Sequence, residues 1–171
     1  YHTGVMRISR MKKMALDFLF PQQCCGCGQV GLLLCESCRG SLQRVPPSCF
    51  VCKRLVPARE RVPAGRTCKM CRPSSSVYAF FSPLAYQDKP MKNMIHALKY
   101  GRAQELAEIF ADMLARDAAK FGVSFPADAL LIPIPLDPIR EQRRGFNQAE
   151  LIAKQLGARW ELEVASGALA H

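Results

Sequence analysis

The sequence predicts a small metal-held domain followed by an α/β domain, and three observations support this. Eight of the nine cysteines form four Cys-x-x-Cys pairs, all within the first 71 residues. Residues 1–75 carry 13 Lys and Arg against 3 Asp and Glu, whereas residues 76–171 carry 11 against 11. Apolar residues recur at helix and strand spacing only after this division. A chain of 171 residues can hold two small domains, and the change in composition favours two.

The four cysteine pairs have the spacing of structural zinc sites. Two sulfurs separated by two residues turn toward one point, and two such pairs supply the four thiolates of a closed tetrahedral site. Gly26 and Gly28 permit the positive φ angles of the first turn, and Cys25 is expected to be a spare thiol. The eight predicted ligands, enough for two zinc ions, are Cys24, Cys27, Cys35, Cys38, Cys49, Cys52, Cys68 and Cys71.

The separations along the chain favour sequential pairing of the cysteines, as in a double zinc ribbon. Fifteen residues between Cys52 and Cys68 suit a four-cysteine module, and seven between Cys27 and Cys35 suffice for a short hairpin. An interleaved arrangement, with the first and third pairs on one ion, stays open. A disulfide scaffold would need an export signal that the N-terminus does not offer, and a thioredoxin-type site uses a single pair.

Composition also divides the chain into segments. Residues 1–20 are predicted to form a basic amphipathic N-terminal helix. Residues 21–75 are rich in Cys, Pro, Arg and Gly and cannot bury much core, so the double zinc ribbon depends on its metal. Residues 76–171 form the α/β domain, after a linker at residues 73–76. No apolar run approaches the roughly 20 residues that cross a bilayer, so a cytoplasmic chain with reduced cysteines is expected.

The positive charge of residues 1–75 predicts a surface for a polyanion. Loading two zinc ions onto eight thiolates lowers this charge but leaves it positive. The alternative, in which the basic residues only solvate a small domain and offset the thiolates, stays open. The candidates to face DNA, RNA or a phosphorylated ligand are Arg39, Arg44, Lys53, Arg54, Arg59, Arg61, Arg66, Lys69 and Arg72.

The second half is predicted to begin with a strand and two helices. Residues 77–86 are apolar and rich in strand formers, although Pro83 limits the strand to a sheet edge or divides it. Apolar residues at i, i+3, i+4 and i+7 predict a helix over residues 91–100, and the same pattern predicts another over residues 106–120.

The remaining elements predict a parallel sheet. Residues 129–136 form a short apolar strand that stops at its prolines. A third helix is expected to begin near Asn147 and to end at Gly157, and residues 160–164 alternate as one more strand. Strand, crossover helix and strand are typical of a parallel sheet with helices on its faces.

The segment after the strand at residues 129–136 is the candidate phosphate site, because open α/β sheets bind ligands at the carboxyl ends of their strands. Three arginines precede the helix that Asn147 caps. Cations are unfavourable near a helix N-terminus unless an anion lies between them and the free N–H groups, which favours phosphate or pyrophosphate. The alternative, in which the arginines only point into water, stays open. The arginines are Arg140, Arg143 and Arg144.

A family resemblance rests on the four cysteine pairs, on residues 84–102, and on Ile132-Pro-Ile-Pro-Leu-Asp-Pro followed by Arg144-Gly-Phe-Asn-Gln-Ala149. Together these motifs closely resemble the ComF family of competence-related proteins, over nearly the whole chain from about Met11. The resemblance implies a double zinc ribbon joined to a partial type I phosphoribosyltransferase-like domain, a parallel sheet with flanking helices. On this template the phosphate-binding residues are Pro135, Leu136, Asp137, Arg140, Arg143, Arg144, Asn147 and Gln148.

The same resemblance implies a role in DNA uptake and natural transformation, with single-stranded DNA or other DNA-uptake proteins as partners. The turn with which such proteins hold phosphoribosyl pyrophosphate, rich in Thr and Gly beside paired acids, is absent from this sequence. We therefore expect the chain to match the first two-thirds of a family member, to leave an apolar sheet edge open, and not to catalyse ribosyl transfer alone. Phosphoribosyl pyrophosphate is expected as a ligand only of a full-length form. The alternative is a non-catalytic zinc-ribbon module that binds nucleic acid or other proteins.

Overall fold

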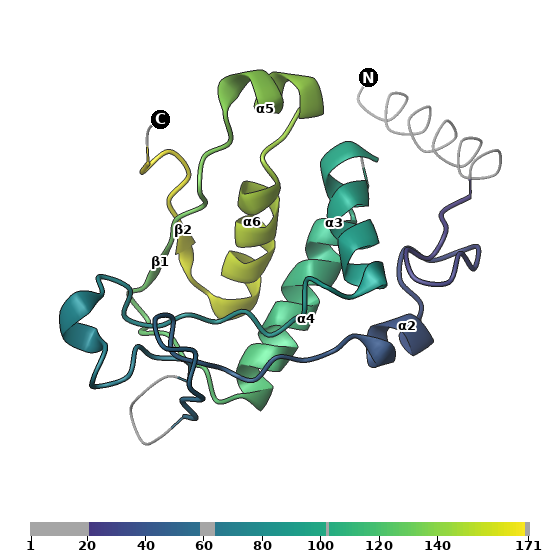
Figure 1. Ribbon diagram of the computed structural model, residues 1–171. Helices are drawn as coiled ribbons and strands as arrows, with labels where there is room; N and C mark the ends of the chain where they lie inside the picture. The colour runs from purple at the N-terminus through teal and green to yellow at the C-terminus, as the bar shows by residue number, and fades with distance from the viewer. Residues whose placement is uncertain (1–20, 59–63, 102, 170–171) are drawn as a thin grey trace.

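The computed structural model describes residues 21–58, 64–101 and 103–169 (Figure 1). The helix predicted over residues 1–20 lies outside these ranges, as do Arg59 and Arg61. The described chain starts with two cysteine-rich modules, continues through two long helices, and ends with a two-stranded parallel sheet and two further helices. No helix in these ranges combines the length and apolarity needed to cross a bilayer.

The two cysteine-rich modules repeat one backbone pattern. In each, an antiparallel bridge closes the turn that carries the first cysteine pair. Helix α2 (Glu36–Ser41) carries Cys38 in the first module, and the 3-10 helix η1 (Arg72–Ser74) follows Cys71 in the second. The modules lie at opposite ends of the molecule in Figure 1, the first in purple and the second in blue to teal.

Two amphipathic helices follow, as the apolar spacing predicts. They are α3 (Lys89–Tyr100) and α4 (Leu106–Lys120). Helix α3 ends at Gly101, whose N–H donates to the Ala97 carbonyl oxygen at 2.8 Å. The buried face of α3 is the predicted stripe of Met91, Met94 and Leu98.

Both long helices share a core with the first cysteine-rich module. Cys24, Leu34 and Leu42 belong to the same buried cluster as Met94 of α3 and Phe110 of α4. Residues from both sides of position 75 therefore stabilise one core by burying apolar surface together. The domain boundary predicted at that position stays a prediction.

The parallel sheet is smaller than the sequence predicts. Strand β1 (Leu130–Leu131) pairs with β2 (Glu163–Val164) in parallel. Prolines at alternating positions follow β1 and cannot donate to a ladder, so the strand predicted over residues 129–136 is cut short. Beyond β1 the apolar residues Ile132 and Ile134 are exposed, and the open sheet edge stays a prediction.

The strand predicted over residues 77–86 does not join this sheet. The segment forms antiparallel bridges to the cysteine-rich modules instead, between Ala79 and Arg66 and again at Leu84. Buried Pro83 lies between the two bridges and divides them because it has no N–H to donate. The assignment of this segment to the α/β sheet was therefore wrong.

Helix α6 (Gln148–Trp160) runs past the end predicted at Gly157. Glu161, at a φ of 55°, ends the helix and donates its N–H to the Gly157 carbonyl oxygen. Gly157 is buried beneath β2, where a Cβ atom would lie 2.6 Å from Cγ2 of Val164. The glycine permits close packing of helix and strand, so both the helix end at Gly157 and the strand start at residue 160 were wrong.

One helix, α5 (Pro138–Arg144), was not predicted. The Asp137 carboxylate caps it by accepting the Arg140 N–H at 3.1 Å, and Gly145 ends it at a φ of 81°. Aspartate at the cap, proline in the first turn and glycine after the last turn are ordinary helix boundaries. The residues that begin and end α5 are therefore recognisable in the sequence.

Candidate functional site

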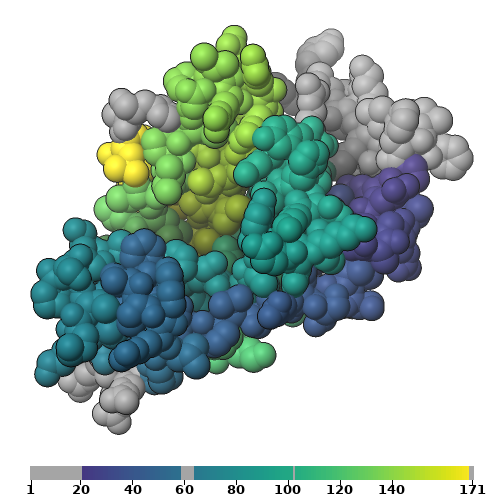
Figure 2. Space-filling model, viewed as in Figure 1, coloured from purple at the N-terminus to yellow at the C-terminus, as the bar shows by residue number. Residues whose placement is uncertain are grey.

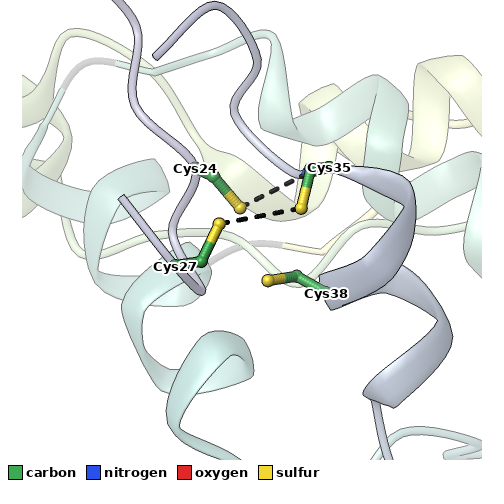
Figure 3. A group of neighbouring side chains, drawn as sticks. All are labelled: Cys24, Cys27, Cys35 and Cys38. Atoms are coloured by element: carbon green, nitrogen blue, oxygen red, sulfur yellow. Dashed lines mark hydrogen bonds between the residues drawn. The ribbon is translucent and has the colours of Figure 1, made fainter. Parts of the chain in front are cut away.

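The four cysteines of the first two Cys-x-x-Cys pairs converge on one point between a turn and helix α2 (Figure 3). Cys24 and Cys27 lie on the turn, Cys35 caps α2, and Cys38 lies within α2. Their sulfurs are all within 4.8 Å of one another, and those of Cys27 and Cys35 are 3.8 Å apart. The Cys35 N–H donates to the Cys24 sulfur at 3.3 Å, so the backbone already favours a thiolate there.

The second four cysteines, Cys49, Cys52, Cys68 and Cys71, repeat this arrangement, with all sulfurs again within 4.8 Å of one another. The sulfurs of Cys52 and Cys68 are 3.7 Å apart, and the Cys68 N–H donates to the Cys49 sulfur at 3.4 Å. The grouping confirms the sequential pairing and not the interleaved alternative.

The donor set of each cluster fits zinc. Four sulfurs at about 2.3 Å from a tetrahedral ion stand about 3.8 Å from one another. The sulfur separation of 3.8 Å between Cys27 and Cys35 and that of 3.7 Å between Cys52 and Cys68 match this distance. Four protein thiolates leave no ligand position for a substrate, so both clusters have the form of structural sites that stabilise the fold.

The thiols of each cluster differ in acidity. Burial raises the pKa of Cys24, but the surrounding backbone N–H groups outweigh it and lower the pKa to about 6. Backbone N–H groups also lower the pKa of Cys49 to about 6. Hydrogen bonds with neighbouring thiols raise the pKa of Cys38 and of Cys71 to about 12. Four adjacent thiols cannot all ionise unaided, so a dication is needed to hold each cluster as four thiolates.

Cys25 lies outside both clusters, as expected of a spare thiol. Burial raises the pKa of its thiol, which keeps it protonated. Its carbonyl oxygen accepts a hydrogen bond from Nδ2 of Asn93 at 2.8 Å. The turn of the first site is thereby tied directly to helix α3.

Two of the basic residues predicted to face a polyanion are held by helix α4. Nη1 of Arg39 lies 2.6 Å from Oδ2 of Asp112, and Nε of Arg44 lies 3.3 Å from Oδ2 of buried Asp117. Arg44 also donates to the Leu42 carbonyl oxygen at 2.7 Å. These two arginines fasten the first module to α4, so their predicted role toward a polyanion was wrong.

Other predicted basic residues are exposed on the second module. The ammonium of Lys53 lies 5.0 Å from the centroid of the Phe50 ring, and the guanidinium of Arg72 lies 4.8 Å from that of Tyr78. Phe50 is the only aromatic residue within residues 21–75, so the contribution of Tyr78 from beyond the predicted linker was missed. The exposed basic residues are Lys53, Arg54, Lys69 and Arg72.

The three predicted arginines meet at a pocket of about 520 Å³ between α5 and the end of α3. Arg144 is fixed there, because its Nη1 donates to Oε1 of Gln148 at 2.9 Å and its guanidinium lies 5.0 Å from the Tyr100 ring centroid. Among the residues that the structure describes, four cations and no carboxylate line the pocket, which favours an anion. Three lining residues were not predicted, Lys99, Tyr100 and Phe146, although all three lie in the stretches that carry the family resemblance. The lining residues are Lys99, Tyr100, Arg140, Arg143, Arg144 and Phe146.

The helix-dipole argument for a phosphate does not hold. Arg143 and Arg144 lie in the last turn of α5, which is the end of a helix that favours cations. They therefore do not need an anion at the start of α6. The phosphate site stays a prediction, and its support is the charge of the pocket.

The predicted residues Pro135, Leu136 and Asn147 line a separate cavity of about 210 Å³. Glu141 and Glu150 share its lining, and no cation does. Two carboxylates disfavour a phosphate. The structure therefore brings the arginines together but does not bring these three residues to them.

Two polar residues of the predicted site cap helices. Asp137 caps α5, and Oδ1 of Asn147 accepts the Ala149 N–H at 2.9 Å at the start of α6. Nδ2 of Asn147 also donates to the Ile134 carbonyl oxygen at 3.0 Å. Asn147 therefore joins the segment after β1 to helix α6.

Comparison with known proteins identifies several relatives. Over 130 residues the chain is 29% identical to the DNA utilization protein YhgH of Salmonella typhi, a match that covers 66% of this chain and 56% of that protein. Over 135 residues it is 30% identical to the competence protein ComFC of Bacillus subtilis (strain 168), covering 72% and 51%. Over 136 residues it is 26% identical to YhgH of Escherichia coli O6:H1, covering 76% and 58%.

The chain spans about half the length of the curated relatives it matches. No family model and no solved structure matches it. The two four-cysteine clusters fit a double zinc ribbon. Together with the similarity to ComFC, they confirm the resemblance to the ComF family that the motifs indicate.

Proposed function

We propose that this chain is the zinc-ribbon and anion-binding part of a protein that handles single-stranded DNA in DNA uptake. The names of its relatives, a DNA utilization protein and a competence protein, support that setting. The observation that carries the proposal is the charge of the second ribbon and its surroundings. Glu60 is the only acidic residue in residues 37–87, a stretch that holds nine Lys and Arg.

Part of this charge is available to a ligand, because four of the nine basic residues are exposed on the second ribbon. Arg39 and Arg44 form ion pairs with aspartates of α4. The exposed basic residues are Lys53, Arg54, Lys69 and Arg72. Each lysine or arginine that neutralises a phosphate releases a condensed counterion, which contributes to affinity and makes it depend on salt. The second ribbon therefore binds the phosphate backbone of the nucleic acid and does not recognise bases through hydrogen bonds.

Fluorescence anisotropy with a labelled single-stranded oligonucleotide tests this at about 50 mM and about 200 mM salt. We expect the affinity to fall steeply as salt rises, and Arg54→Glu with Lys69→Glu to weaken binding and flatten the salt slope by about two units, one per contact. Lys154→Glu reverses a charge on α6, at a residue that does not line a hollow of the second ribbon, and serves as the control. No binding at low salt, or an affinity independent of salt, would contradict the proposal.

A second candidate function concerns the arginine pocket between α5 and α3. Lys99, Arg140, Arg143 and Arg144 concentrate positive charge at one end of the sheet, where a diphosphate fits by charge. We propose that the pocket binds the diphosphate of phosphoribosyl pyrophosphate in a longer, phosphoribosyltransferase-like protein. The observation that favours it is the set of four cations with no carboxylate in the lining.

Calorimetric titration with inorganic pyrophosphate tests this candidate on the chain as it stands. We expect binding that Arg140→Glu and Arg143→Glu abolish and that Lys120→Glu leaves unchanged. Arg144 is unsuitable for this test because its contacts with Gln148 and Tyr100 also hold the local structure. Absence of heat and of thermal stabilisation at millimolar pyrophosphate counts against the candidate.

A further inference from the structure

A groove of about 380 Å³ opens beside the second ribbon, between its first hairpin and the segment that leads to α3. Figure 2 shows these two stretches, blue and teal, adjoining one another on one face of the molecule. Among the described residues the lining is mainly apolar and aromatic, with two serines, a glutamine, one cation and no acidic side chain. It includes Pro46, Pro47, Lys53, Phe80, Leu84 and Tyr86.

Exposed aromatic rings, each accompanied by a lysine, mark this groove. Phe80 packs against Phe50 with ring centroids 5.4 Å apart, and the Lys53 ammonium lies 6.0 Å from the Phe80 centroid. The Lys92 ammonium lies 5.8 Å from the centroid of the Tyr86 ring, which is 60% exposed. Exposed rings of this kind are the platforms on which unpaired bases stack.

The backbone of Lys53 adopts a strained, left-handed conformation. Its φ is 60°, and its N–H donates to the Cys49 carbonyl oxygen at 3.0 Å. Gly28 has the equivalent place in the first ribbon, with a φ of 79° and an N–H that donates to the Cys24 carbonyl oxygen at 2.9 Å. Glycine adopts this left-handed conformation without strain, and lysine does not.

The strained position places the Lys53 side chain against the aromatic rings. Its ammonium donates to the Phe50 carbonyl oxygen at 2.7 Å while lying over two rings. Backbone strain at a surface residue is a reason to look for function, because folding alone is better served by glycine. The two ribbons therefore differ at this position, where only the second carries a side chain.

We propose that this groove binds the bases of single-stranded DNA, which stack on Phe80 and Tyr86 while Lys53 and Lys92 contact the adjoining phosphates. The inference rests on the proposed function and names the surface that performs it. Stacking is indifferent to base identity, because every base has a π face. A duplex keeps its bases stacked within the helix, so the groove selects single strands.

The variant Lys53→Gly separates binding from folding. Glycine removes the backbone strain, so we expect a thermal midpoint at least equal to that of the unmodified chain. We expect the affinity for a thymidine 15-mer to fall about tenfold, because the variant loses a phosphate contact and the order of the rings around it. A merely structural role for Lys53 predicts no change in affinity.

The Tyr86 ring is tested by a matched pair of variants. Tyr86→Ala should weaken binding about tenfold, and Tyr86→Trp should retain it, because stacking needs a ring of any kind. Phe125→Ala removes another exposed ring, which does not line this groove, and should leave the affinity unchanged. An abasic strand of equal length and charge should bind about tenfold more weakly than the thymidine strand and should not respond to Tyr86→Ala.

The results distinguish this inference from the proposed function. Equal affinity for abasic and thymidine strands, or unchanged affinity in both Lys53→Gly and Tyr86→Ala, overturns the groove while salt-dependent DNA binding stands. Absence of any binding to single-stranded DNA overturns both.

Discussion

Nη1 of Arg39 donates to Oδ2 of Asp112 at 2.6 Å. This hydrogen bond joins helix α2 of the first cysteine-rich module to the middle of helix α4. Arg44 repeats the connection with Asp117 further along α4. Two residues that charge counting assigned to a nucleic-acid surface therefore hold the first module against the helices. Of the other residues assigned to that surface, Lys53, Arg54, Lys69 and Arg72 are exposed on the second module, which we propose as the binding ribbon.

The Arg39 contact predicts a pH dependence of stability. Burial raises the pKa of Asp112, but the hydrogen bonds from Arg39 and Arg116 outweigh it and lower the pKa below its ordinary value. A lowered folded-state pKa contributes stability that is complete above the unfolded value and is lost as pH falls through the folded value. Urea denaturation from neutral to acidic pH should therefore show Asp112→Asn less stable by about 1–2 kcal/mol at neutral pH, with the difference vanishing in acid.

Glu36 offers a matched control for this prediction. Its carboxylate lies 3.8 Å from Nε of Arg39 and is 90% exposed, so water screens the pair. Glu36→Gln should change stability by no more than about 0.5 kcal/mol. An equal effect of both substitutions would show that the Asp112 contact is not special.

The shared core predicts that the two zinc sites contribute unequally to stability. Cys24 and Cys35 lie in the cluster that includes Met94 and Phe110, whereas the second site lies outside that cluster. Both Cys38→Ser and Cys71→Ser should reduce the zinc content from two ions to one per chain. Scanning calorimetry should show a fall on the order of 10 °C or more in the main transition for Cys38→Ser only. Equal falls would contradict the assignment of anchoring to the first ribbon.

Gly157 predicts a local packing defect. A Cβ atom there would lie 2.6 Å from Cγ2 of Val164 and 2.9 Å from the Leu162 carbonyl oxygen, so Gly157→Ala forces α6 and β2 apart. We expect a loss of about 1–3 kcal/mol in chemical denaturation. Gly40→Ala in α2 is the control, because nothing lies within 4 Å of its added methyl group and helix propensity favours alanine. A neutral Gly157→Ala would show that the strand does not pack there.

The two side-chain hydrogen bonds of Asn147 should make separate contributions to stability. Asn147→Ala removes both the cap on α6 and the donor to the Ile134 carbonyl oxygen, and should cost about 1–3 kcal/mol. Asn147→Asp keeps the cap and removes only the donor, so it should cost less. If both variants retain full stability by urea denaturation, the residue does not join β1 to α6.

Features fixed by local chemistry were predictable, and features made by distant contacts were not. The spacing of Met91, Met94 and Leu98 and of the cysteine pairs carries its own geometry, so α3 and both metal clusters follow from it. Residues 77–86 have the composition of a strand, but they pair with residues of the two ribbons. The periodicity of the sequence does not indicate this pairing. In the sequence Gly157 resembles a helix end, but in the structure it lets α6 pack closely against β2.

The candidate groove could not be predicted from the sequence for the same reason. Lys53, Phe80 and Tyr86 come from three separated positions and share no spacing that indicates a site. Only folding places them together. The unusual lysine after the third cysteine pair was nonetheless present in the sequence, where the first pair is followed by glycine.

The central claim, that two sequentially paired cysteine clusters each hold one zinc ion and thereby build the anchoring and the binding ribbon, is tested most directly by native mass spectrometry. The chain, purified without chelator, should carry two zinc ions with all nine cysteines reduced. One ion per chain, or a metal-free mass with paired disulfides, would contradict the account.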